Sequence, residues 1–280
     1  QLSMYMRQYL SKKRDSSHLS WPERNTEEYS RGVGKLLDTD FDAGSFSDDD
    51  LAHLALKIFL RLQVDTKLGI PRRKLKRFIQ SVRHHMLDNP YHNWTHVTDV
   101  LQAVYALGTK SGLLGRLSDI ELLSLLIAAL CHDLEHPGVS NLGIIRSSPV
   151  LSSLYDSSAT LEKHHSLRAL SLMMNEEVDL LSELEAELYV PLRDTVSRLI
   201  MATDMSRHAD YSARIDEMIR HRESNTTSSK FFGDGKEEED RQMEMEILIK
   251  LADTSNVLRP MPIAKRWALR VTDEFFEQGD

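Results

Sequence analysis

The chain has 280 residues and a formal net charge of −8, so it lacks the overall positive charge with which proteins bind nucleic acid or acidic membranes. Its 12 Gly and 8 Pro are few beside 11 Met and a Leu-rich remainder, which favours helices over a turn-rich sandwich or barrel. The single cysteine, Cys131, excludes an intramolecular disulfide and indicates a reducing, cytoplasmic compartment.

The sequence predicts no membrane-spanning segment and no targeting signal. Its most apolar run, residues 122–131, is far shorter than the ~20 residues of a spanning helix. No charged segment followed by an apolar one stands at the start, as it would in a signal peptide. Because the chain begins with Gln1 rather than Met, we expect it to be part of a longer protein whose regulatory modules lie outside it.

Apolar residues recur at helical spacing along the chain, and no run alternates as a strand would, so we predict an all-α fold. Residues 1–50 are polar and predict short helices and loops of the same domain, and residues 51–280 predict its core. We expect a solvated loop without site residues between Glu223 and Asp240. Helices are predicted after a Ser47 cap, from Pro71, after Pro90, and over 119–130, 161–174, 180–188, 191–205, 211–221, 245–251 and 263–276.

Two histidines, His92 and His96, stand four residues apart after Tyr91. On a helix, rings at this spacing share a face and can bind one ion. Pairs of this kind are common by chance and more often structural, so the pair alone is weak support for a metal site.

A denser polar group follows the apolar run at the end of a predicted helix. Burying such groups without partners is costly, so a core helix that ends in His-Asp indicates metal ligands. The group comprises His132, Asp133, Glu135, His136 and Asn141.

Three further candidates are weaker when each is taken alone. Glu162 with His164 and His165, and Asp204 with His208, can equally be satisfied surfaces of helices, and Asp253 can equally be a capping or turn aspartate. Mixed His and Asp ligands without cysteine suit a borderline ion such as zinc beside a harder one such as magnesium or manganese. The set as a whole predicts a binuclear hydrolase.

Five motifs then stand in a fixed order: Tyr-His-Asn-x-x-His at 91–96, His-Asp-x-x-His-Pro-Gly-x-x-Asn at 132–141, Leu-Glu-x-His-His at 161–165, Ala-Thr-Asp-Met at 202–205 and Ala-Asp-x-Ser-Asn at 252–256. Because of these motifs the chain, from about Phe59 to Asp280, resembles the class I 3′,5′-cyclic-nucleotide phosphodiesterase family. In the residues of its motifs it is most similar to the cAMP-hydrolysing members. The resemblance implies a compact multi-helix catalytic domain of HD-like type.

The resemblance also implies roles for individual residues. His92 would be the general acid, oriented by Glu274, and Tyr91 and Asn256 would face the base or sugar. His164, His165 and His208 match family positions, but a structural role is equally open for each. A Zn²⁺ would be held by His96, His132, Asp133 and Asp253, and Asp133 would bridge to a second ion, Mg²⁺ or Mn²⁺. Water around the ions would be held by His136, Glu162 and Thr203. The pocket would be stiffened by Asn141 and Asp204.

The implied reaction is hydrolysis of cAMP, or of cAMP and cGMP, to the 5′-monophosphate, which ends a cyclic-nucleotide signal. Hydroxide held by two metals would attack phosphorus while His92 protonates the leaving O3′. In the family a glutamine and an aromatic residue that grip the base follow the segment matching 278–280. Because the sequence ends at Asp280, we expect a truncated C-terminal part and leave the preference between the two nucleotides open.

Two other functions compete with this interpretation. A different His-Asp metallophosphohydrolase would account for His132 and Asp133 but not for the motif at 91–96 or for Asp253. A silent nucleotide-binding or scaffold domain would show a gap in its acid or ligand set, and this chain shows none. The sequence permits a homodimer without indicating one.

Overall fold

The computed structural model describes residues 20–147, 159–224 and 237–279, which form α-helices and short 3₁₀ helices with no strand among them. The all-α prediction is therefore confirmed. None of the helices in these ranges is long and apolar enough to cross a membrane. The α-helices are α2 (Thr26–Lys35), α3 (Asp48–Arg61), α4 (Val64–Lys67), α5 (Arg72–His85), α6 (Trp94–Lys110), α7 (Asp119–Cys131), α8 (Asn141–Ser147), α10 (Thr160–Met173), α11 (Ala186–Ala202), α12 (His208–Ser224), α13 (Glu237–Thr254) and α14 (Met261–Gln278); the 3₁₀ helices are η1 (Ala43–Ser45), η2 (Leu113–Gly115), η3 (Met205–Arg207) and η4 (Ser255–Leu258).

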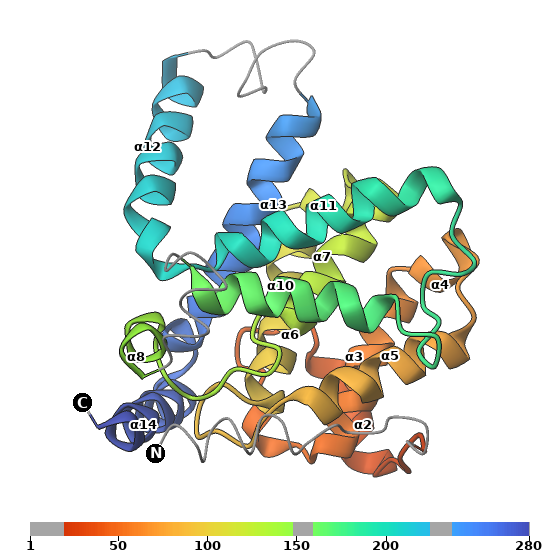
Figure 1. Cartoon of the computed structure of the whole chain (residues 1–280), viewed down its shortest axis with the longest axis horizontal. Coiled ribbons are helices and arrows are strands. Elements are labelled where there is room, and N and C mark those ends of the chain that lie inside the picture. The colour runs from red at the N-terminus through yellow and green to blue at the C-terminus, as the bar shows by residue number, and fades with distance from the viewer. Residues whose placement is uncertain (1–19, 148–158, 225–236, 280) are drawn as a thin grey trace.

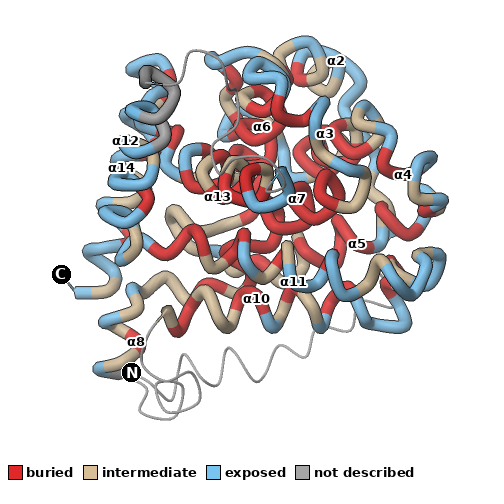
Figure 2. The backbone as a smooth tube through the Cα atoms, turned by 90° about the horizontal axis from the view of Figure 1, so that it is seen from above, coloured by how far each residue is buried: buried red, intermediate tan, exposed pale blue. Residues whose placement is uncertain are grey.

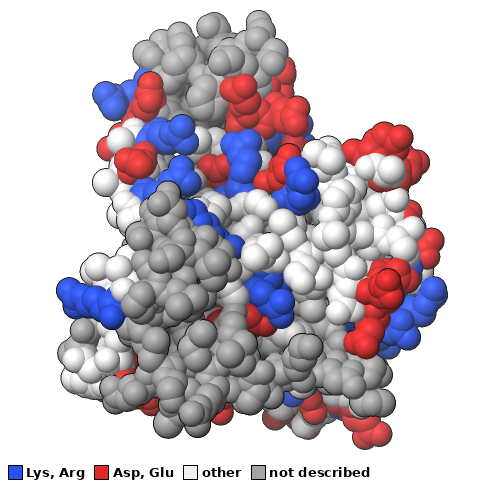
Figure 3. Space-filling view, viewed as in Figure 1, with Lys and Arg blue, Asp and Glu red and all other residues white. Residues whose placement is uncertain are grey.

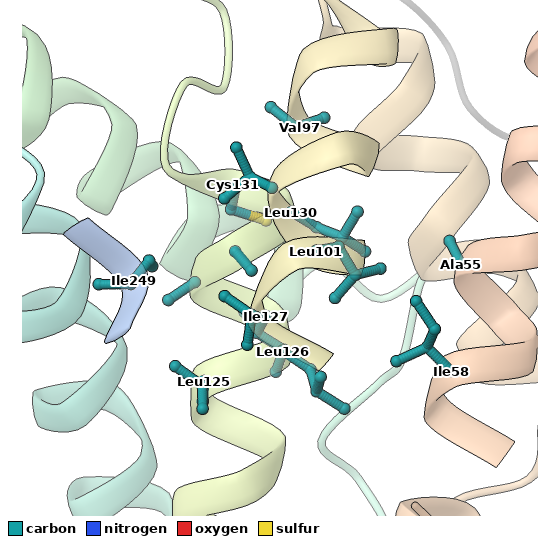
Figure 4. Close-up of a cluster of buried hydrophobic side chains, with 14 of the residues drawn as sticks. Ala55, Ile58, Val97, Leu101, Leu125, Leu126, Ile127, Leu130, Cys131 and Ile249 are labelled. Carbon is teal, nitrogen blue, oxygen red and sulfur yellow. The ribbon is translucent and has the colours of Figure 1, made fainter. Parts of the chain in front are cut away.

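The centre of the molecule is α7, which is apolar on all sides and lies among α6, α11 and α13 (Figures 1 and 2). Ser118 and Glu121 form a capping box at its start, so the helix begins where the apolar run begins. Figure 4 shows its side chains packed against those of α3, α6 and α13. Each fully buried Leu or Ile contributes ~1.5–3 kcal/mol relative to an exposed one, so the end of α7 is held firmly.

The first turn of α6 is fixed by its cap. Asn93 accepts a hydrogen bond from the backbone N–H of His96 at 3.1 Å, which satisfies a donor left open at the helix start. The Trp94 indole donates to the carbonyl of Asp48 at 3.1 Å and ties this turn to α3. The His96 side chain therefore starts from a fixed point at the edge of the core.

The predicted helices over 180–188 and 191–205 are wrong in their boundaries, because one helix, α11, runs from Ala186 to Ala202. Asp179 adopts a left-handed φ of 52°, and the buried Lys74 ammonium binds its carboxylate at 2.8 Å, which holds the following residues in turns. Pro191 lies inside α11 on an exposed face. Its missing N–H leaves one carbonyl without a helical partner, and on an exposed face water can satisfy that carbonyl.

The loop predicted between Glu223 and Asp240 is only partly correct. Residues 225–236 lie outside the described ranges, but Glu237–Asp240 form the acidic first turn of α13, where carboxylates interact favourably with the helix dipole. Figure 1 shows α12 and α13 projecting together from the rest of the molecule. The far end of α13 returns to the core and carries Asp253 in its last turn.

The last helix, α14, begins after Pro260 and ends at Gln278, with Gly279 as its C-cap. Gly279 has a left-handed φ of 96°, and its N–H bonds to the carbonyls of Phe275 and Phe276, which closes the helix. The helix lies beside η4 and α8 at the edge of the molecule (Figure 1), and from it Glu274 points inward to a buried position.

Candidate metal centre and active site

Four predicted ligands converge where three helix ends meet. His96 comes from the first turn of α6, His132 and Asp133 from the end of α7, and Asp253 from the last turn of α13. One potential ligand atom from each lies within 4.8 Å of all the others. Nε2 of His96 is 3.2 Å from Oδ2 of Asp133 and from Oδ1 of Asp253, and Nε2 of His132 is 3.2 and 3.3 Å from the same two atoms.

The chemistry of this cluster fits a divalent cation. Nδ1 of His132 donates to the carbonyl of Ala129 at 3.0 Å, which turns Nε2 toward the cluster. Nε2 of His132 and Oδ2 of Asp133 are buried and lie 3.2 Å apart, but neither has a partner in hydrogen-bonding geometry among the described residues. Buried polar atoms are rarely left unpaired, and a metal ion between two imidazoles and two carboxylates would satisfy both atoms.

The electrostatics of the cluster agree with a cation site. Burial alone would lower the pKa of His96, but Asp133 and Asp253 outweigh it and raise the pKa to about 9. Burial alone would raise the pKa of Asp253, but the rings of His132 and His96 hold it well below its usual range. The pocket therefore favours positive charge, which protons supply when no metal is bound.

A second set of donor atoms adjoins the first through Asp133. Its carboxylate, His136 and His165 offer ligand atoms within 4.8 Å of one another. Nδ1 of His165 donates to the carbonyl of Leu134 at 2.7 Å, and Nδ1 of His136 accepts from the N–H of Gly138 at 3.1 Å. Burial lowers the pKa of both rings, that of His165 to about 3, so both are neutral imidazoles.

Two of the residues predicted to support the site are joined directly. The Asn141 amide donates to both carboxylate oxygens of Glu162, at 3.3 and 3.0 Å, and its carbonyl oxygen accepts from the N–H of Leu161 at 2.9 Å. Burial raises the pKa of Glu162, while the bond from Asn141 opposes the shift. These contacts join the start of α8 to the start of α10 beside the second set.

Thr203 and Asp204 follow α11. The Thr203 hydroxyl donates to the carbonyl of Ile200 at 2.8 Å, and the Asp204 carboxylate caps η3 by accepting from the N–H and hydroxyl of Ser206 at 2.8 and 2.7 Å. The carbonyl of Asp204 accepts from the buried Lys250 ammonium at 2.9 Å, which ties this turn to α13. His208, the first residue of α12, is exposed and is not among the donor groups that the structure brings together.

His92 is partly exposed beside the cluster and forms a hydrogen bond with a residue of the last helix, α14. Its Nδ1 forms a short hydrogen bond to Oε1 of Glu274, while Oε2 of Glu274 accepts from the backbone N–H groups of Tyr91 and His92 at 2.9 and 3.0 Å. Burial alone would raise the pKa of Glu274, but the hydrogen bond from His92 lowers it, so this carboxylate stays ionised. The His92 ring stacks on that of His136 with centroids 3.8 Å apart.

Tyr91 and Asn256 meet beside the metal cluster. The Asn256 amide donates a short hydrogen bond to the Tyr91 hydroxyl, and the Tyr91 ring lies over that of His96 with centroids 4.6 Å apart. The structure thus brings the two predicted substrate-facing residues together.

Asn89 joins the two halves of the site, and the sequence interpretation missed it. Its side-chain amide donates to the carbonyls of His92 and His136 at 2.9 and 2.7 Å. The amide therefore links the loop before α6 to the turn after α7. Asn89 precedes Pro90 and suggests only a turn in the sequence, since an uncharged amide gives no sign of a metal site.

In this all-α domain, imidazole and carboxylate side chains come together where helix ends meet. This arrangement is typical of helical proteins with a His-Asp metal-binding centre. Within that class, residues 91–280 match the family model described as 3′5′-cyclic nucleotide phosphodiesterase. The chain belongs to this family. The family is metal-dependent, and the cluster of His96, His132, Asp133 and Asp253 is able to hold a metal ion.

Individual relatives agree with the family model. The chain is 36% identical over 257 residues to the 3′,5′-cyclic-nucleotide phosphodiesterase regA of Dictyostelium discoideum, which covers 91% of this chain and 30% of regA. It is 34% identical over 239 residues to the high affinity cGMP-specific 3′,5′-cyclic phosphodiesterase 9A of Drosophila melanogaster, which covers 85% of this chain and 15% of that protein. The chain thus spans less than a third of either relative.

A solved structure agrees as well. The phosphodiesterase domain of the RhoPDE fusion protein from Salpingoeca rosetta superposes with a TM-score of 0.80 at 31% identity. The match covers 89% of this chain and 76% of that domain. The fold predicted from the family resemblance is confirmed.

Proposed function

We propose that this chain hydrolyses 3′,5′-cyclic nucleotides to nucleoside 5′-monophosphates. The observation that carries the proposal is that the four-ligand cluster and the His92–Glu274 pair adjoin one another. The ring centroids of His92 and His96 are 5.8 Å apart, so a phosphate held at the cluster lies next to a ring that can donate a proton.

His96, His132, Asp133 and Asp253 would hold the tighter ion, and Asp133, which belongs to both sets of donor atoms, would also serve a second ion. Two imidazole nitrogens suit Zn²⁺ at the first position, and an oxygen-rich, hydrated second position suits Mg²⁺ or Mn²⁺. When bound, the ions supply an activated water and neutralise charge on the phosphate. His136, Glu162 and Thr203, supported by Asn141 and Asp204, hold and orient the water molecules around them.

His92 acts as the general acid. Because its Nδ1 donates to Glu274, its Nε2 is the nitrogen left to carry a proton to O3′ of the leaving ribose. Proton transfer of this kind contributes typically ~10²- to 10⁴-fold to the rate. Glu274 fixes the ring through its side chain and fixes the loop through the N–H groups of Tyr91 and His92.

Tyr91 and Asn256 contact the base or sugar. The relatives' names include a cGMP-specific enzyme, cAMP enzymes and one that is dual for both nucleotides, so the proposal is made for cyclic nucleotides as a class. The hydrogen bond between the Asn256 amide and the Tyr91 hydroxyl holds these two polar side chains together, so that they offer one joint hydrogen-bonding surface.

The cell compartment and the partner are part of the same proposal. Cys131 is a buried free thiol, in keeping with a reducing cytoplasm. Figure 3 shows cationic and anionic side chains interspersed around α12 and α13, in keeping with a small-molecule substrate rather than nucleic acid.

The proposal is tested by measuring 5′-AMP and 5′-GMP released from cAMP and cGMP, with and without a chelator. We expect turnover of at least one nucleotide that is lost with chelator and restored by Zn²⁺ with Mg²⁺ or Mn²⁺. His208→Ala is the matched control, since His208 is an exposed histidine outside the donor groups, and it should leave turnover within twofold. Metal-loaded protein that releases neither product would contradict the proposal.

A further inference from the structure

Glu135 adopts an unusual backbone conformation in the turn that carries the metal ligands. Its φ is 62°, in the left-handed region that residues with a side chain rarely occupy. The turn runs from His132 to His136, and Glu135 lies between Asp133, which belongs to both sets of donor atoms, and His136. Strained residues at such places persist only where the surrounding contacts hold them.

Two cationic or polar side chains of α10 hold Glu135. Arg168 donates to its carboxylate through two nitrogens, Nε to Oε2 at 2.9 Å and Nη2 to Oε1 at 2.7 Å. His164 donates to Oε2 from Nε2 at 3.1 Å. In this clasp of Glu135, Arg168 and His164, the Glu135 side chain is only 12% exposed and that of Arg168 is 34% exposed. The two parallel bonds from Arg168 fix the orientation of the Glu135 carboxylate.

The same helix meets the turn at neighbouring points. His165 donates to the carbonyl of Leu134 at 2.7 Å, one residue before Glu135, and Glu162 binds the side chain of Asn141 beyond the turn. One face of α10 therefore contacts the backbone and side chains of the turn in succession. The contact of Arg168 with Glu135 is an ion pair, and it acts on the residue with the left-handed φ itself.

We propose that Glu135 is a positioning residue: its clasp with Arg168 and His164 holds the turn so that Asp133 and His136 face the second metal ion. Glu135 touches neither the proposed ions nor the substrate, and it acts through the turn. The inference rests on the proposed two-metal site, and it gives Glu135, which is in none of the donor groups that the structure brings together, a role other than that of a ligand.

The clasp should affect the two ions unequally. The tighter position also has His96, set by the Asn93 cap, His132, held by Ala129, and Asp253, carried by α13. The second position depends on the turn, because Asp133 and His136 both belong to it. Loss of the clasp should therefore weaken binding of the second ion and leave binding of the first unchanged.

The chain offers a matched pair of variants. Arg168→Met removes the ion pair to Glu135, whose side chains are 34% and 12% exposed. Arg241→Met removes an ion pair to Glu121 whose side chains are 27% and 11% exposed. Binding of Mn²⁺ to the zinc-loaded chain is measured by electron paramagnetic resonance, and zinc content by mass spectrometry. We expect Arg168→Met to raise the Kd for Mn²⁺ by ~10-fold or more with zinc content unchanged, and Arg241→Met to leave the Kd within twofold.

Two further variants separate the clasp from general damage. In Glu135→Gly the glycine can adopt the left-handed φ, but the bonds to Arg168 and His164 are lost. This change should therefore weaken Mn²⁺ binding as Arg168→Met does. The exchange Glu135→Arg with Arg168→Glu should bind Mn²⁺ several-fold tighter than either single change. Wild-type Mn²⁺ affinity in Glu135→Gly, or equal weakening by Arg241→Met, would overturn the inference. Mn²⁺ binding needs no turnover, so failure of the proposed reaction would be seen separately.

Discussion

The metal cluster and the proton-donor pair adjoin each other but are supported in opposite ways. The proposed ligands His96 and His132 are 1% exposed and come from helix ends fixed by a cap and a packed core. His92 is 24% exposed, and it is held by Glu274, which lies 182 residues later on the peripheral helix α14. The proposed ligands are therefore held by the core, whereas the proposed acid is bonded at its Nδ1 by a side chain of the peripheral helix α14. The two functions should therefore separate under mutation.

The largest loss is expected from breaking the core side. Asp253→Ala removes one of two carboxylates that balance the His96 and His132 rings, so it should release the tighter ion and lower turnover by at least ~10³-fold. Zinc content and turnover are measured on the same preparation. Full zinc retention would show that Asp253 is not a ligand.

Removing the proposed acid should lower turnover without releasing metal. His92→Ala should keep both metals and reduce turnover by ~10²- to 10⁴-fold, because only the proton donor is lost. The same metal analysis and product assay check it. Turnover equal to wild type would remove His92 from the mechanism, and loss of metal would mean that the two halves are not independent.

The pH dependence of metal affinity sharpens the same comparison. In the metal-free protein the pKa of His96 is raised to about 9 and that of His132 is raised well above its usual value, so both rings are protonated at neutral pH. Metal must displace these protons, and affinity should rise with pH up to about 9, by as much as ~100-fold per unit if two protons leave. Calorimetry in buffers of different ionisation enthalpy counts the protons. Affinity that stays flat between pH 6 and 8 would contradict the assignment.

A smaller effect is expected from the contact that links the two halves of the chain. Glu274→Gln keeps the shape but removes the charge that His92 faces, and a hydrogen bond to a charged group is worth ~1.5–3 kcal/mol, or ~10- to 100-fold in rate. Metal content should not change. Glu277→Gln, an exposed glutamate on the same helix, is the control and should be silent. Equal losses of turnover in both variants would mean that the effect comes from a general disturbance of α14 and not from the bond between Glu274 and His92.

The sequence predicted the all-α fold and a group of candidate ligands that the structure brings together, because both leave local signals. An apolar run ending in His132-Asp133 predicts a core helix with candidate ligands at its end, and the motif around Asp253 adds a further candidate. The boundary of α11 could not be predicted, because the buried Lys74 holds Asp179 from another helix. Glu135 was visible as a carboxylate, but its φ and its contact with Arg168 arise only from tertiary packing.

The smallest predicted effect asks whether α14 as a whole, or Glu274 alone, supports the acid. An alanine Cβ at Gly279 would meet nothing within 4 Å, so Gly279→Ala adds only the strain of a left-handed φ, ~1–2 kcal/mol. The last turn should fray, with a slightly lower Tm, while Glu274 stays packed one turn further in. Turnover should then remain within twofold of wild type. A fall as large as that of Glu274→Gln would mean that the acid depends on the whole end of α14, and the peripheral half of the site would be as cooperative as the core half.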